Sequence, residues 1–254
     1  MTAKEDYALA RKLANEIAAT YAAPRFNSEL GKERDLSGKM LYSHPILEKS
    51  RLIVKERDED FGHGLSHLEK VAIDAGAIVQ NESARRGYSS AQTEREMFLV
   101  LLASLLHDVK RRVPNHALES AKAASEILLD FPLESEERNW IVKSIQNHEA
   151  FTAPAPIGCP EGQLLSDALY DADKFRWGPD NFTDTVWEMI SSRDLPIRAL
   201  LAHFPKGMDG VKKIATTFRS ETGIEYGPEF IEIGIAIGNK LYEELIERFP
   251  LEKD

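Results

Sequence analysis

Apolar residues recur at helical spacing along most of this chain, and no stretch alternates with period two for long enough to predict a strand. Near the N-terminus, for example, Ala10, Leu13 and Ile17 share one face. Helices are predicted at about residues 4–21, 45–57, 64–81, 91–108, 116–130, 135–149, 162–176, 181–192, 195–204, 208–220 and 227–249. Residues 22–44 contain turn-forming residues without a period, and we expect a long surface loop there. The predicted fold class is all-α.

The most apolar stretch, MFLVLLASLLHDVKRR at residues 97–112, raises a chemical question. Ten uncharged residues lead directly into His107 and Asp108, and cations follow. Such a run belongs in a protein core, where polar groups are costly unless something binds them. A partner for both side chains is therefore expected.

Other predicted helices also carry polar residues near one end of an apolar face. His67 lies one turn before Val71 on the inward stripe of its helix, and His148 follows Ile145 on another. A lone histidine on such a stripe is usually a core residue that hydrogen-bonds locally. Several of them from different helices are more simply explained by one shared cation, as in metal sites inside helical bundles.

The helix predicted at 162–176 offers two aspartates for this role. Asp173 continues the stripe of Leu169, whereas Asp171 continues a neighbouring stripe that includes Ala168. The phase of the helix does not choose between them.

Composition narrows the classes of partner. The 254 residues include 43% hydrophobic and 29% charged residues, and the net charge is −10, so nucleic acid polymers and acidic membranes are not expected partners. Cys159 is the single cysteine, which excludes an intramolecular disulfide and leaves no basis for a zinc knuckle. The polar N-terminus lacks a signal-peptide apolar block, and we expect a cytoplasmic protein.

The segments HGLSHLEKV, LLHDVKRR, NH at 147–148 and YDADKF together resemble the HD-domain superfamily of metal-dependent phosphohydrolases. The resemblance covers about residues 60–176. It implies that His67, His107, Asp108 and Asp173 are metal ligands, the last because the family's final Asp typically precedes a basic residue, here Lys174.

The same resemblance implies an HD-domain-like helical bundle. Residues 60–176 would form its core, residues 1–59 would be N-terminal helices and a loop packed on it, and residues 177–254 would be a helical annex of the same domain.

Family members differ in the number of metal ions, and this chain permits one or two. His148 resembles the extra ligand of two-metal members, while His116 resembles either a further ligand or a histidine that acts on the substrate. His63 is a candidate outer ligand or proton donor. Imidazoles and carboxylates suit Mn, Fe, Co, Ni or Zn, and Mg remains an option.

The implied activity is hydrolysis of a phosphomonoester, phosphodiester or nucleotide by a metal-activated water. The candidate catalytic residues are Asp108, His116, Lys110 and Lys174, with the two lysines placed to bind a phosphate. Arg111 and Arg112 are read as a solvated helix end. The alternative is an HD-type di-iron oxygenase acting on a polyol or phosphonate-like substrate. The expected partner is a small phosphate-bearing molecule, and the oligomeric state is left open.

Overall fold

The computed structural model describes residues 3–57, 64–191 and 195–251. Its elements are, in chain order, α1 (Ala3–Ala18), α2 (Arg25–Glu29), α3 (Gly31–Ser43), α4 (Pro45–Arg57), α5 (Leu65–Arg86), α6 (Ser90–Leu106), α7 (His116–Ile127), the 3-10 turn η1 (Leu128–Asp130), α8 (Ser135–Gln146), α9 (Pro160–Phe175), the π-helical turn η2 (Asn181–Thr185), α10 (Val186–Ser191), α11 (Ile197–Ile214) and α12 (Glu221–Arg248). These ranges contain no strand, which confirms the prediction of an all-α protein.

α6 forms the centre of the larger core. All its side chains from Glu96 to Leu106 are buried, and the helix contacts α4, α5, α8 and α9. A helix that is apolar on every side is stable only when neighbours enclose it. α6 starts where the Ser89 hydroxyl accepts a hydrogen bond from the backbone N–H of Gln92. It ends at Leu106, so His107 emerges from the helix inside the core.

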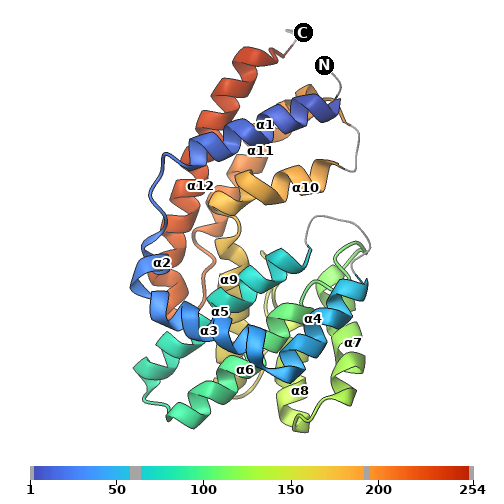
Figure 1. Ribbon diagram of the computed structural model, residues 1–254, viewed down its shortest axis with the longest axis vertical. Helices are drawn as coiled ribbons and strands as arrows, with labels where there is room; N and C mark the ends of the chain where they lie inside the picture. Colours follow the sequence, from blue (N-terminus) through green and yellow to red (C-terminus); the bar gives the residue numbers. More distant parts are fainter. Residues whose placement is uncertain (1–2, 58–63, 192–194, 252–254) are drawn as a thin grey trace.

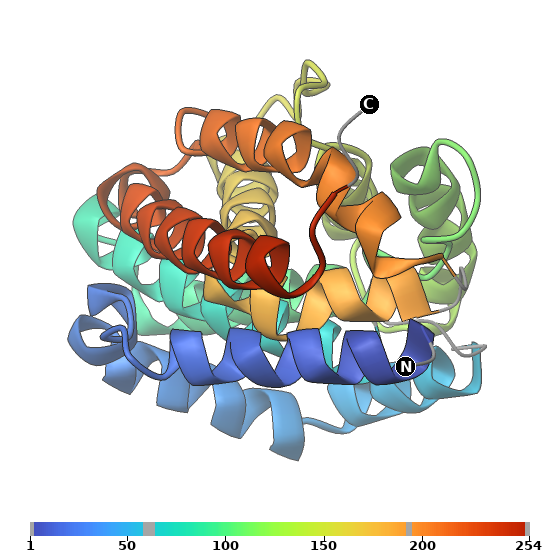
Figure 2. The same cartoon turned by 90° about the horizontal axis from the view of Figure 1, so that it is seen from above.

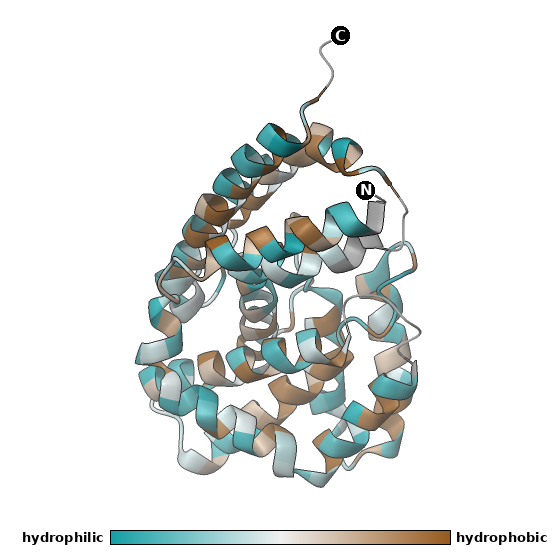
Figure 3. Cartoon of the chain, turned by 45° about the horizontal axis from the view of Figure 1, so that its top comes forward, coloured by the Kyte–Doolittle hydropathy of each residue, from teal (hydrophilic) through white to brown (hydrophobic). Residues whose placement is uncertain are grey.

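A second core lies between the N-terminal helix and the C-terminal helices. α1 contacts η2, α10, α11 and α12, and these elements lie together in the upper part of Figure 1 and side by side in Figure 2. Figure 3 shows hydrophobic and hydrophilic positions interleaved along these helices, as expected when only one face is buried. α1 therefore packs with the C-terminal helices, although α3 and α4 of the same predicted segment pack against α5 and α6.

The prediction of a loop at residues 22–44 is wrong. α2 and α3 occupy most of it, and α3 packs closely on α5. A Cβ atom added at Gly76 of α5 would lie 2.4 Å from the hydroxyl of Ser37 in α3, so the two backbones approach closely. This packing outweighs the weak helix propensity of the segment.

The C-terminal third also differs from its predicted boundaries. α11 is one helix where two were expected, and it contains Pro205. α12 begins at Glu221 instead of 227, because Ser220 caps it and the helix accommodates Pro228. Proline and glycine interrupt a sequence pattern more strongly than they interrupt a helix supported by a core. None of the described helices combines the length and apolarity needed to cross a membrane.

Candidate metal centre

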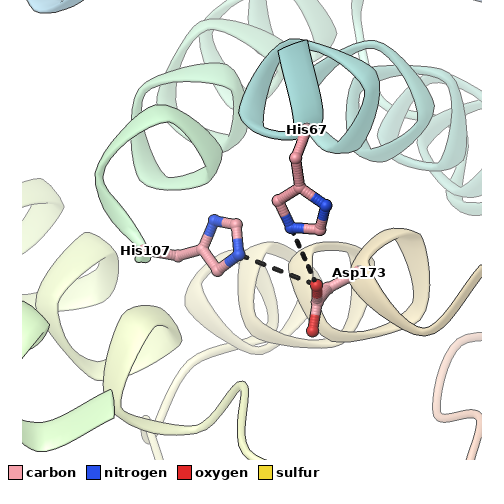
Figure 4. A group of neighbouring side chains, drawn as sticks. All are labelled: His67, His107 and Asp173. Atoms are coloured by element: carbon pink, nitrogen blue, oxygen red, sulfur yellow. Dashed lines mark ion pairs between the residues drawn. The ribbon is translucent and has the colours of Figure 1, made fainter. Parts of the chain in front are cut away.

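The first cluster of ligand-type side chains joins α5, the end of α6 and α9. The Asp173 Oδ1 atom lies 3.4 Å from Nε2 of His67 and 3.7 Å from Nε2 of His107. Figure 4 shows the two imidazoles converging on the carboxylate. Residues more than one hundred positions apart in the sequence thus share one site.

A second cluster overlaps the first at His107. Asp108 places Oδ2 3.5 Å from Nε2 of His107 and Oδ1 3.4 Å from Nε2 of His148. The ligand atoms within each cluster all lie within 4.8 Å of one another, a separation that one cation can bridge. His107 therefore stands between Asp108 and Asp173.

Backbone carbonyls fix the orientation of two of these rings. The Nδ1 atom of His107 donates to the carbonyl of Ser104 at 2.7 Å, and Nδ1 of His148 donates to the carbonyl of Ile145 at 2.6 Å. A carbonyl only accepts, so Nδ1 of each ring carries a proton, and Nε2 is the ring atom that faces the site. This is the arrangement that metal-binding histidines usually have.

Buried polar atoms at the site lack hydrogen bonds within the described chain. They are Nε2 of His107, Nε2 of His148 and Oδ1 of Asp108. Burying such groups unpaired is expensive, and native proteins rarely do it. A divalent cation would satisfy all three, and nitrogen and oxygen donors suit first-row transition metals. The residues present fit a metal ion.

Charge at the site also favours a cation. Burial alone would raise the pKa of Asp108, but the imidazoles of His107 and His148 outweigh burial and hold it well below its usual range. The same balance holds for Asp173, whose pKa is kept low mainly by Lys174. Both aspartates are therefore ionised in a buried place.

His116 lies beside these clusters without belonging to either. Its Nε2 atom accepts a hydrogen bond from Arg111 at 2.6 Å and lies 3.8 Å from Oδ1 of Asp108. Asn115, which precedes it, has a left-handed backbone with φ of 56°, a conformation that asparagine tolerates better than most residues. Burial, with help from Arg111, lowers the pKa of His116 and favours the neutral ring.

The structure separates the two aspartates that the sequence left open. Asp173 faces His67 and His107, whereas Asp171 accepts hydrogen bonds from the backbone N–H groups of Arg219 and Ser220. Asp171 therefore secures the start of α12. Burial raises its pKa to about 7.

The structure separates the two lysines that were predicted to bind a phosphate. Lys174 is buried, and its Nζ atom lies 2.5 Å from Oδ2 of Asp173. Lys110 is exposed and does not line the cavity described below, whereas Arg111 does. Arg112 is exposed, as expected. The prediction for Lys110 assumed that the helix continued beyond His107. α6 instead ends at Leu106 and the chain then turns, so helical spacing does not give the direction of the Lys110 side chain.

Next to the clusters lies a cavity of about 450 Å³. Its lining residues are His67, Asp108, Arg111, His116, His148, Glu149, Ala150, Phe151, Asp173, Lys174, Arg176, Trp177, Asn181, Phe182, Thr185, Val186, Leu200, Phe204, Gly207, Met208 and Val211. The ligand-type side chains thus border a space large enough for a small molecule.

The remaining histidines contribute little to this site. His203 is exposed on α11, and His44 packs on Phe98 at a distance from it. His63 falls outside the described residues. Cys159 caps the start of α9, where its Sγ atom accepts a hydrogen bond from the backbone N–H of Gly162.

No family model, curated protein or solved structure matches this chain. We therefore infer the function from the side chains of the site and from the cavity beside them.

Proposed function

We propose that this protein is a metal-dependent phosphohydrolase that cleaves a phosphomonoester, phosphodiester or nucleotide. One observation carries the proposal: His107 belongs to two clusters of ligand-type side chains, one with Asp108 and the other with Asp173. Both carboxylates line a cavity that Arg111 and Lys174 also line. The sequence resemblance to the HD-domain superfamily supports the same conclusion. His67, His107, Asp108, His148 and Asp173 would hold one or two divalent ions, with His116 adjacent.

A bound divalent ion lowers the pKa of water from near 16 to about 7 and so supplies hydroxide at neutral pH. In the hydrolysis, a water oxygen would bond to phosphorus while the bond from phosphorus to the ester oxygen breaks. The leaving oxygen would take up a proton, so that a monoester gives an alcohol and phosphate, and a diester gives an alcohol and a phosphomonoester.

The chain's own residues bind and orient the substrate. Arg111 and Lys174 line the cavity and lie beside Asp108 and Asp173, so they offset the negative charge of these carboxylates where an anionic phosphate would approach a protein with a net charge of −10. The neutral imidazole of His116 lies within 3.8 Å of Asp108 and borders the cavity, where it can hold or deliver a proton.

The test is metal analysis combined with phosphate release. The protein is loaded separately with Mn, Fe, Mg, Co, Ni and Zn, and hydrolysis of generic phosphoesters is measured with each ion. His107→Ala and Asp108→Ala are expected to lose bound metal and activity together, whereas the exposed His203→Ala should keep both. Full metal content and turnover in either of the first two variants would contradict the proposal.

The di-iron oxygenase alternative uses the same set of ligands, so the same preparation distinguishes it. Two irons per chain, oxygen uptake with a polyol or phosphonate, and no phosphate release from phosphoesters would favour that activity. The cations Arg111 and Lys174 beside the site disfavour a neutral polyol, which gains little from two positive charges. They would attract a phosphonate as well as a phosphoester, so hydrolysis of phosphoesters decides between the two activities.

A further inference from the structure

The cavity beside the metal centre has two chemically different walls. Charged and ligand-type side chains come from α5, the turns after α6 and α8, the start of α7, and α9. Most of the remaining lining is apolar, and it comes from residues 150–151 and 177, from η2 and from α10 and α11. In Figure 1, α10 and α11 lie above α5, α6 and α8, and α9 runs between the upper and lower helices.

The apolar wall is extensive. Its side chains are Ala150, Phe151, Trp177, Phe182, Val186, Leu200, Phe204, Met208 and Val211. Apart from the indole N–H of Trp177, these groups offer no hydrogen bonds to hydroxyl groups, and they bind apolar surface. A sugar placed against them would lose its hydrogen bonds to water without replacement.

Few polar groups on this side are free to compensate. Arg176 lines the cavity, but its guanidinium is already paired with Asp74 and Asp180. Asn181, Thr185 and the indole N–H of Trp177 are the remaining polar side-chain groups that the described chain contributes to this wall. Three such groups are too few to match the hydroxyls of a hexose.

Phe151 gives an independent indication of an apolar ligand. It is 64% exposed although it lines the cavity, and its backbone has a left-handed φ of 64°. A bulky residue in this conformation is strained, and such strain is frequently found at binding sites. An exposed ring that borders a cavity gains contacts when an apolar group enters.

We propose that the substrate is a phosphoester of an apolar alcohol, whose phosphate faces Arg111, Lys174 and the metal centre and whose hydrocarbon group lies on the α10 and α11 wall. This inference rests on the proposed function for the reaction, and it narrows the substrate class to one that excludes sugar phosphates.

The test compares ethyl, hexyl and decyl phosphate, with a hexose phosphate and adenosine monophosphate as polar comparators. Each buried methylene adds about a fourfold gain. kcat/KM should therefore rise by about that factor per methylene until the cavity is filled, and the polar comparators should be poorer substrates than hexyl phosphate.

Two glycines of α11 provide a matched pair of variants. Gly207 lines the cavity and Gly210 does not, and a Cβ atom added at either position meets no atom within 4 Å. Gly207→Leu fills space at the apolar wall and should reduce the ratio of kcat/KM for decyl over ethyl phosphate by about tenfold or more. Gly210→Leu carries the same helix-favouring change and should leave that ratio as it is.

Calorimetric binding of ethyl-, hexyl- and decylphosphonate separates failure of this inference from failure of the proposed function. If phosphoesters are hydrolysed but neither kcat/KM nor phosphonate affinity rises with chain length, the apolar substrate class is overturned. If no phosphoester is hydrolysed with any metal, the phosphohydrolase is overturned. An affinity that still rises with chain length and falls in Gly207→Leu would then support the apolar ligand alone.

Discussion

At the scale of single residues, the two lysines that the sequence treated alike have different surroundings. Lys174 is 4% exposed and contacts Asp173, whereas Lys110 is exposed and outside the cavity. Replacing Lys174 by Met removes a cation that would face the phosphate in the proposed function, and the KM for a phosphate substrate should rise about tenfold, equivalent to about 1.4 kcal/mol. Steady-state kinetics test this. The matched Lys110→Met should not change KM, and equal effects of both changes would show that only general charge matters.

Glu96 provides a prediction about pH that is independent of the metal centre. Burial raises its pKa to about 7, and the carboxylates of Glu161 and Glu137 add to this. The unfolded chain loses the same proton near 4.5, so the folded state binds more protons between these values. The free energy of unfolding should therefore fall as pH rises from about 4.5 to 7.

Glu96→Gln removes that dependence. The variant should gain roughly 1–3 kcal/mol relative to the natural protein at pH 8, with little gain at pH 4.5, as measured by urea unfolding. The exposed Glu94→Gln on the same helix serves as the control and should change stability by less than about 0.5 kcal/mol at either pH. A gain at pH 8 that persists at pH 4.5 would contradict the titration argument.

Residue-level prediction from sequence succeeded where helical phase was valid. His67 and Asp173 lie within helices, and their spacing from apolar neighbours indicated the inward face. Arg111 was interpreted as part of a solvated helix end, yet it lines the cavity, because it follows the end of α6 in turns whose direction depends on tertiary packing. Asp171 shared the inward orientation of Asp173, and only the position of α12 distinguishes them.

At the scale of elements, a buried ion network joins α3, α5 and the end of α9. Asp74 is fully buried and accepts from Arg34 at 2.8 Å and from Arg176. Asp74→Ala would remove one of the two carboxylates that neutralise the buried charge of Arg176. Breaking such a network should lower the free energy of unfolding by about 3–5 kcal/mol. Chemical denaturation measures the loss. The exposed Arg85→Ala, which removes ion pairs of α5 with α12, should cost less than about 1 kcal/mol, and similar losses would contradict this ranking.

The start of α12 depends on a close approach to α9. A Cβ atom added at Gly223 would lie 2.0 Å from the Oδ2 atom of Asp171, which itself accepts from Ser220. Gly223→Ala should therefore destabilise the protein by about 1–3 kcal/mol in thermal or chemical unfolding. Gly210→Ala, in open space on α11, should instead be neutral or stabilise by up to about 1 kcal/mol. Stabilisation by both changes would show that α9 and α12 move apart easily.

The boundaries of a helix could be predicted where its sequence carries an unbroken apolar stripe that packs on one core. α6 and α9 were recognised in this way, while α3 was not, because its helix is supported mainly by packing on α5 and not by its own pattern. Pro205 and Pro228 likewise suggested breaks that the surrounding packing overrides.

At the scale of the whole molecule, the cavity unites two cores whose relation no local pattern reveals. Phe204 and Met208 belong to the core shared with α1, yet they line the same cavity as Asp108 and Asp173. Sequence periodicity identifies inward faces, but it cannot state which inward faces meet. The apolar wall of the cavity was therefore beyond prediction, although the ligand cluster was not.

Metal loading should stabilise the folded chain as a unit. The unpaired atoms of His107, Asp108 and His148 exist as a cluster only in the folded state, so an ion that binds them favours folding. An ion at one hundred times its Kd contributes about 2.7 kcal/mol. For a chain of this size that corresponds to a rise in Tm of roughly 5–10 °C.

Scanning calorimetry with each ion and with a chelator measures this rise, and His107→Ala should abolish it. The cluster joins α5, α9 and the ends of α6 and α8, and α1 contributes no ligand to it. When the metal ion binds, backbone hydrogen exchange through local opening should therefore slow near the ligands in α5 and α9 and at the ends of α6 and α8. Exchange in α1 should stay unchanged. Slower exchange in α1 alone, or a Tm that no ion raises, would mean that the buried imidazoles and carboxylates do not bind a cation.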